Sequence, residues 1–158
     1  MNSGRAVSVQ LDVAPQVVVA NNAFHRWMIH CMAACDMKEL GTMDILVLHN
    51  ANHRERAKRL ADICFTLNIE DSHTVAYALR KLVKLGLLNG ERRGKETFYT
   101  ASEAGKDLCL RYREVREQCL IEALGGAGTS NEEIGELARL LRSLAGVYDQ
   151  AARAAASL

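Results

Sequence analysis

Apolar residues recur at intervals of three and four over most of the chain, and this spacing predicts helices. The first such segment runs from Val17 to Lys38 and carries a stripe formed by Phe24, Trp27, Met28, Cys31, Met32 and Cys35. Gly41 and Thr42 break the pattern, and a short helix is expected from Met43 to Asn50. Residues 1–16 show no sustained periodicity, so we expect a flexible arm there.

The middle of the chain predicts two short helices joined by a polar turn. Asn52 and Glu55 have the spacing of a helix N-cap and its reciprocal carboxylate, which places a helix start near His53. After a turn at residues 67–70, Asp71 can cap a second helix. The apolar residues of that helix fall on one face, and they are Val75, Leu79, Leu82 and Val83. Gly86 can end the helix in the left-handed conformation.

Strand-like segments follow, and then helices return. Residues 87–91 and 97–100 predict a β-hairpin whose tip is formed by Arg92, Arg93, Gly94 and Lys95. Capping-box spacing at Thr100 with Glu103, and at Ser130 with Glu133, predicts a long helix over 101–124 and a last helix after the glycine-rich residues 125–128. The order predicts a mostly α protein with a small β-hairpin, in which a winged helix-turn-helix is flanked by helices at both ends.

The net charge of +1 conceals an uneven distribution of charged residues. Residues 51–100 carry ten bases and six acids, whereas residues 1–50 and 101–158 have net charges of −1 and −2. The positive charge is therefore concentrated in the predicted helix-turn-helix and hairpin, as expected of a surface that faces phosphates. No apolar run is long enough to cross a membrane, and the N-terminus lacks an export signal, so we expect a cytoplasmic protein without a membrane partner.

The second helix of the predicted helix-turn-helix would enter the major groove of double-stranded DNA. Its apolar stripe leaves a polar face formed by Ser72, His73, Thr74, Tyr77, Arg80 and Lys81. Hydroxyl groups and imidazole can bond base edges or phosphates, and the two cations can reach phosphates or guanine. Taken alone, this polar face is more typical of a helix that is simply exposed to solvent.

The basic hairpin tip favours the DNA-binding interpretation. Arg92, Arg93 and Lys95 are crowded at a tight turn, where like charges repel unless an anion or solvent compensates them. A basic loop beside a helix-turn-helix can follow the DNA backbone or enter the minor groove. The alternative is a charged edge hairpin that merely guards against aggregation.

The segment resembles the winged-helix domain of the MarR family of bacterial transcription regulators. LADICFTLNIEDSHTVAYALRKLVKLGLL is similar to the family's helix, turn, recognition helix and closing Gly-Leu, and GKETFYTASEAGKDL to its second wing strand and the start of the next helix. The resemblance covers about residues 43–110. One departure is the wing, where Glu91-Arg92-Arg93-Gly94 stands in place of the family's frequent Asp-x-Arg element and implies a shorter reach.

The resemblance implies a domain organisation and a function. Residues 17–40 and 102–158 would form N- and C-terminal dimerisation helices around a DNA-binding region at 41–101, all within one compact domain. The protein would be a sequence-specific regulator that acts as a homodimer on a pseudo-palindromic operator, and a small-molecule effector could change the spacing of its recognition helices. The alternative is a winged-helix module for protein–protein contact without specific DNA binding, which the modest net charge leaves open.

Other chemistries have little support in the sequence. Cys31 and Cys35 could form a thiol switch, but cysteine also packs readily on a buried stripe, and no base lies beside either thiol. His49 and His53 have the spacing of a helical metal site without a third ligand, so no metal is expected. No nucleophile elbow or phosphate loop is present, and we expect neither an enzyme nor a cofactor.

Overall fold

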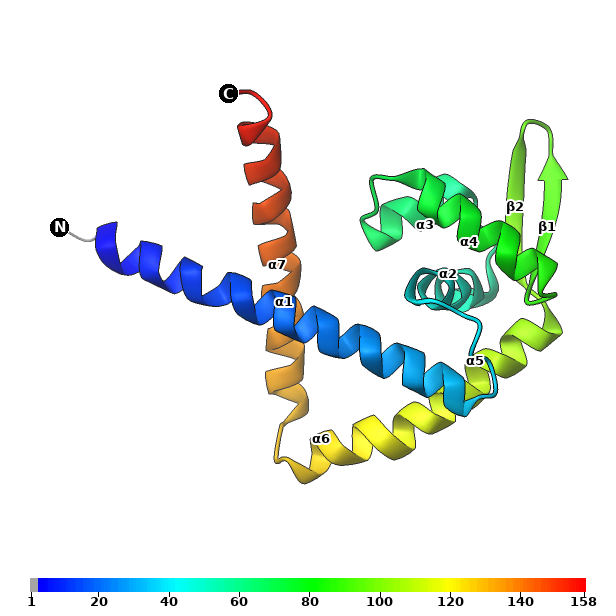
Figure 1. Cartoon of the computed structure of the whole chain (residues 1–158), viewed down its shortest axis with the longest axis horizontal. Helices are drawn as coiled ribbons and strands as arrows, with labels where there is room; N and C mark the ends of the chain where they lie inside the picture. The colour runs from blue at the N-terminus through cyan, green and yellow to red at the C-terminus, as the bar shows by residue number, and fades with distance from the viewer. Residues whose placement is uncertain (1–2) are drawn as a thin grey trace. The chain divides into compact units, whose positions relative to one another are not determined.

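The computed structural model describes the backbone of residues 3–158 and the side chains of residues 13–158. Helices dominate, and the only strands among these residues form one antiparallel hairpin (Figure 1). The elements are α1 (Ser3–Ala34), α2 (Thr42–Asn52), the 3₁₀ turn η1 (His53–Glu55), α3 (Leu60–Leu67), α4 (Ser72–Lys84), β1 (Leu88–Arg93), β2 (Glu96–Ala101), α5 (Glu103–Arg116), the π-helical segment η2 (Glu117–Ile121), α6 (Glu122–Gly126) and α7 (Asn131–Ala155). The predicted fold class is confirmed.

The chain divides into two compact units. One unit ends at Arg116 and the other is Glu117–Leu158. The physical reason is that the apolar core lies entirely in the first unit, whereas residues 117–158 contain no buried side chain. No helix among the described residues is long and apolar enough to cross a membrane.

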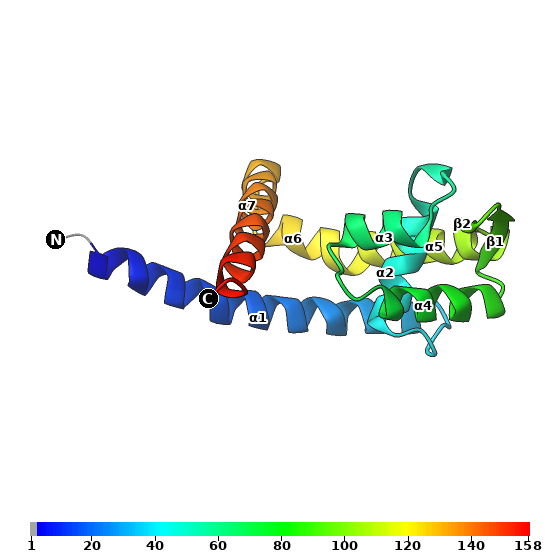
Figure 2. The ribbon, with the colours of Figure 1, turned by 90° about the horizontal axis from the view of Figure 1, so that it is seen from above.

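The core of the first unit is built around α2. This helix contacts α1, α3, α4, α5 and β2, and Figure 2 shows the helices packed closely around it. Its side chains Ile45, Val47 and Leu48 are fully buried. The neighbouring helices add buried side chains to the same core. These include Met28 and Met32 of α1, Ile63 of α3, Val75, Leu79 and Leu82 of α4, and Leu108 of α5.

Helix α1 is longer than predicted. It begins at Ser3, so the segment expected to be a flexible arm is helical from that residue, and it continues through Pro15. A proline removes one helical hydrogen bond and can bend a helix without ending it, which is why the sequence pattern is misleading here. Among the side chains of α1 that are described, residues 13–34, those in the core lie in its C-terminal part, while Val18, Val19 and Phe24 are exposed.

The prediction of a helix that starts near His53 is wrong. Residues 53–55 form a 3₁₀ turn in which Arg54 and Glu55 have positive φ, and α3 starts at Leu60. The intervening chain must be extended because Lys58 pairs with Tyr99 of β2 through two backbone hydrogen bonds. The carboxylate of Asp62 accepts the Arg59 N–H at 2.9 Å and so supplies the cap that the sequence assigned to Asn52 and Glu55.

The hairpin is longer and its turn tighter than predicted. The register pairs Arg93 with Glu96 and leaves Gly94 and Lys95 as the turn. Gly94 has φ of +64°, which fits a two-residue turn with glycine at its first position. After β2 the chain enters α5 at Ser102, rather than at Thr100 as predicted, and the Ser102 hydroxyl accepts the Gly105 N–H at 3.1 Å.

The second unit contains η2, α6 and α7. The predicted capping box at the start of α7 is confirmed, since Ser130 Oγ accepts the Glu133 N–H at 3.1 Å and Glu133 Oε2 accepts the Ser130 N–H at 2.8 Å. Helix α7 carries large apolar side chains that remain exposed within this chain, namely Ile134, Leu137, Leu140, Leu141, Val147 and Tyr148.

Candidate nucleic-acid interface

Helix α4 separates an apolar face from a polar one. Its buried residues are Val75, Ala78, Leu79 and Leu82, and its N-terminus is capped by Asp71, whose carboxylate accepts the His73 N–H at 3.0 Å. The predicted contacts on the opposite side are Ser72, His73, Thr74, Tyr77 and Arg80, of which Tyr77 is 65 % exposed although it is aromatic and sits near the middle of the helix. The helix therefore presents a continuous polar surface with one aromatic ring.

A shallow apolar groove lies beside this surface. It has a volume of about 510 Å³ and is lined by Gly41, Thr42, Met43 and Asp44 at the start of α2 and by His73, Thr74 and Tyr77 of α4. The start of α2 and the first turns of α4 therefore lie next to each other. Sequence reasoning did not connect these two segments, because they are separated by the whole of α2 and α3 along the chain.

Lys81 makes contacts within the protein that the sequence did not predict. Its ammonium lies 2.6 Å from a carboxylate oxygen of Asp44, which is only 6 % exposed, and donates to the Glu39 carbonyl at 2.6 Å. The same carboxylate accepts the Gly41 N–H at 2.8 Å. Lys81 thus joins α4 to the start of α2, and the Asp44 carboxylate compensates its charge.

The three basic residues of the hairpin are exposed but not equivalent. The Arg93 guanidinium lies 4.9 Å from the centre of the Phe98 ring and 2.7 Å from Glu91, and its hydrogen bond with Glu91 raises the pKa of Arg93 and lowers that of Glu91. Arg92 donates to the Gly94 carbonyl at 3.3 Å. Lys95, like Arg80 on α4, has no ion-pair partner among residues 13–158. Arg93 is therefore held against the hairpin while Lys95 remains available.

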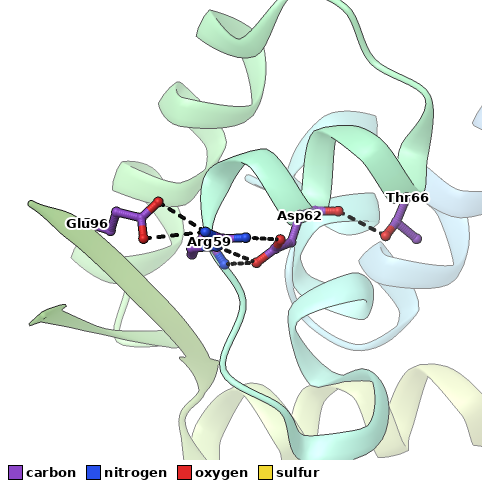
Figure 3. Close-up of polar contacts among 4 residues, drawn as sticks. All are labelled: Arg59, Asp62, Thr66 and Glu96. Atoms are coloured by element: carbon purple, nitrogen blue, oxygen red, sulfur yellow. Dashed lines mark hydrogen bonds and ion pairs between the residues drawn. The ribbon is translucent and has the colours of Figure 1, made fainter.

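A charged cluster links α3 to the hairpin (Figure 3). The Arg59 guanidinium forms two hydrogen bonds with Asp62, at 3.0 and 2.9 Å, and reaches Glu96 of β2 at 3.2 Å. Hydrogen bonds from the Arg59 side chain, followed by that from its backbone, lower the pKa of Asp62 to about 2. No local sequence pattern indicates this cluster, because Arg59 and Glu96 are 37 positions apart and lie at the ends of two different elements.

A second hollow lies away from α4, between the end of α2 and α5. It has a volume of about 520 Å³, and its basic lining residues are His49, His53, Arg54, Lys106, Arg113 and Arg116. The His49 ring meets Tyr112 edge-on with 4.5 Å between centroids. Burial, together with the charge of Arg116, lowers the pKa of His49. Because its pKa lies below the ordinary 6.5, the His49 ring is mostly neutral at pH 7.

The cysteine and histidine candidates lie in surroundings that differ from those of a reactive thiol or a helical metal site. Cys31 and Cys35 are buried, and burial raises the pKa of the Cys35 thiol, which disfavours the thiolate that a redox switch uses. His49 belongs to α2 and His53 to the 3₁₀ turn, so the two do not share an α-helix. Among the described residues no three potential ligands gather around one point.

A helix-turn-helix with an exposed polar second helix and a basic hairpin defines a winged helix. In agreement, residues 40–105 match the family described as the winged helix DNA-binding domain. A comparison of the sequence with curated proteins finds no match.

Solved structures place this domain in a specific fold. The chain is similar to NMB1585, a MarR family regulator from Neisseria meningitidis, with a TM-score of 0.70 and 18 % identity over 90 % of this chain and 95 % of that one. The chain is also similar to the transcriptional regulator BldR from Sulfolobus solfataricus, with a TM-score of 0.70 and 15 % identity over 87 % of this chain and 97 % of that one. For Staphylococcus aureus MarR in complex with salicylate and kanamycin, the TM-score is 0.70 and the identity is 12 % over 90 % of this chain and 94 % of that one. The resemblance to the MarR family is confirmed: the chain has the fold of these regulators and contains a winged helix DNA-binding domain.

Proposed function

We propose that this protein is a MarR-type transcription regulator that binds double-stranded DNA sequence-specifically as a homodimer on a pseudo-palindromic operator. The observation that carries the proposal is α4, whose apolar face is buried while Ser72, His73, Thr74 and Tyr77 form a polar face toward solvent. These side chains are suited to base edges in the major groove. The role needs no catalytic residue, and a regulator of this kind works in the cytoplasm, where bacterial DNA lies.

The cations divide into three groups in this proposal. Arg80 is exposed on α4 and would contact a phosphate, and Arg92 and Lys95 would contact the DNA backbone or minor groove from the hairpin. Arg93 would contribute mainly by its charge, since Phe98 and Glu91 hold its guanidinium. Lys81 is left out of the DNA-contacting set because Asp44 and the Glu39 carbonyl bind its ammonium.

The homodimer is supported by the second unit. Residues 117–158 have no buried side chain, yet α7 presents an apolar stripe that includes Ile134, Leu137, Leu141 and Tyr148. A helix with such a stripe is stable in water when the stripe is covered. A second copy of the same helices would cover it and would fix two recognition helices about one turn of DNA apart.

The proposal also includes the binding of a small-molecule effector. The hollow between α2 and α5 suits a small anionic molecule, with Arg113 and Arg116 as the cationic groups on its wall, whereas Lys106 is paired with Glu103 and with Glu55, which also lines the hollow. The Staphylococcus aureus structure was solved with salicylate, an aromatic anion of suitable size. A thermal-shift titration with salicylate should raise the melting temperature of the wild type but not that of Arg113→Ala. An equal shift in both proteins would remove this hollow from consideration.

DNA binding itself is tested by salt dependence. Each phosphate contact contributes a slope of about −0.9 to the plot of log K against log salt concentration. A dimer with several contacts should lose about a thousandfold in affinity between roughly 50 and 200 mM salt. A flat plot with random and genomic duplexes alike would sink the proposal and leave the fold as a protein–protein module.

A further inference from the structure

The hairpin β1–β2 is attached to the rest of the first unit at two levels. Near its base, Lys58 and Tyr99 exchange backbone hydrogen bonds of 3.0 and 2.8 Å, so the residues before α3 act as a short third strand. Farther out, Glu96 at the start of β2 is held by the Arg59 side chain at 3.2 and 3.4 Å. Glu96 pairs with Arg93 next to the turn, so this second attachment reaches the tip of the hairpin.

The Arg59 guanidinium is itself fixed. Asp62, in the first turn of α3, binds both Nε and Nη2 of Arg59 and also accepts the Arg59 N–H. Figure 3 shows the guanidinium between the two carboxylates, with α3 on one side and the strand on the other. Because an arginine has several donors in a rigid plane, it can bind two carboxylates simultaneously in a defined geometry. The Glu96 side chain is therefore connected to the helix-turn-helix through a rigid intermediate.

We propose that Arg59 and Glu96 are positioning residues that set the angle of the hairpin relative to the recognition helix α4. A two-stranded hairpin alone is marginally stable, and its tip bends easily about its base. The Arg59–Glu96 contact restrains this bending, and α3 transmits the constraint because it packs against α4. The proposal rests on the proposed function only where it concerns DNA affinity.

The sign of a mutational effect distinguishes positioning from simple electrostatics. Glu96 is negative and lies near the face assigned to DNA, so neutralising it would by charge alone strengthen binding. Positioning predicts the opposite, because a mobile tip places Arg92 and Lys95 less accurately. Glu91→Gln is the matched control, since it removes the same charge from the same hairpin, and Glu91 pairs only with Arg93 of that hairpin among the described ion pairs.

The test compares wild type, Glu96→Gln, Arg59→Gln and Glu91→Gln. Amide hydrogen exchange at Tyr99 and in the outer hairpin should accelerate by about two- to fivefold in the first two variants and not in Glu91→Gln, in line with the strength of an exposed ion pair. Glu96→Gln should also weaken binding to a specific duplex by about two- to tenfold and remove protection at the flanking minor groove, whereas Glu91→Gln should bind as tightly as wild type or more tightly.

Unchanged exchange in Glu96→Gln and Arg59→Gln would overturn the proposal whatever happens to DNA binding. Tighter DNA binding by Glu96→Gln would also overturn it, because charge would then outweigh geometry. If no variant and not even the wild type binds DNA, the proposed function fails, while the exchange rates still decide whether this pair holds the hairpin. Thermal unfolding of each variant shows whether the exchange effect is local.

Discussion

Arg80 and Lys81 are neighbours in sequence with opposite surroundings. Arg80 is exposed without an ion-pair partner among the described residues, whereas Lys81 is bound to a carboxylate that is 6 % exposed. Removing Lys81 would leave the Asp44 carboxylate in the interior with only the Gly41 N–H, and an under-satisfied buried charge is costly. Substitution of Lys81 should therefore affect stability, whereas substitution of Arg80 should affect DNA binding.

We predict that Lys81→Ala lowers the free energy of unfolding by about 1–3 kcal/mol and leaves the salt slope of DNA binding unchanged. Arg80→Ala should leave stability nearly unchanged and reduce that slope by about 0.9 for each phosphate that the arginine neutralises. Urea denaturation and binding titrations at several salt concentrations measure both quantities. A reduced slope in Lys81→Ala at unchanged stability would return that residue to the DNA-contacting set.

The lowered pKa of His49 should make the free energy of unfolding depend on pH. Its pKa is lowered from the usual 6.5 because the ring is buried and Arg116 is near, so the folded protein binds fewer protons than the unfolded chain. The neutral ring's contribution is fully present above about pH 6.5 and is lost as the pH falls toward the lowered folded-state pKa. His49→Phe, which can keep the edge-on contact with Tyr112, should flatten the fall in stability between about pH 7.5 and 5 in urea denaturation. Parallel curves for both proteins would contradict this origin.

At the scale of elements, Gly105 sets how closely α5 approaches the end of α4. A Cβ atom at this position would lie 2.1 Å from the Leu87 carbonyl oxygen, far inside van der Waals contact. The same carbonyl accepts the Ser102 N–H at 3.0 Å, so it cannot move without breaking the entry into α5. The glycine is thus required for packing even though it sits inside a helix.

We predict that Gly105→Ala destabilises the fold by about 1–3 kcal/mol. Gly135→Ala on α7 is the matched control, because no atom lies within 4 Å of its would-be Cβ. Alanine there should stabilise the helix by about 0.5–1 kcal/mol, since it lowers the entropy of the unfolded chain. Thermal or urea unfolding of the two variants should move in opposite directions, and equal shifts would refute the packing argument.

Local patterns in the sequence predicted the elements that are stabilised locally. Helix α4 with its Asp71 cap and the Ser130–Glu133 capping box follow from residues within one or two helical turns. The start of α3 was missed because Lys58 must be extended to pair with Tyr99 of the distant strand β2, and this pairing overrides the local Asn52–Glu55 signal. For the same reason the Lys81–Asp44 and Arg59–Glu96 pairs could not be predicted, since each depends on tertiary packing.

At the scale of the whole molecule, the exposed stripe of α7 is the surface that most needs a partner. Leu137 and Leu141 are each at least 50 % exposed and lie one turn apart on the same face. We predict that Leu137→Glu combined with Leu141→Glu converts the protein to a monomer and weakens operator binding by at least about a hundredfold, since each recognition helix would then bind alone. Arg142→Glu, on the same helix but off the stripe, is the control. Sedimentation equilibrium measures the mass, and a doubly substituted protein that remains dimeric would place the interface elsewhere.

The central claim is sequence-specific recognition of duplex DNA by a homodimer, and selection of bound sequences from random duplex DNA tests it most directly. We predict enrichment of an inverted repeat whose half-sites are centred about 10 base pairs apart. The enriched duplex should bind one dimer, and its affinity should fall steeply with salt. A bound pool that shows no enriched motif over the starting pool would contradict the claim.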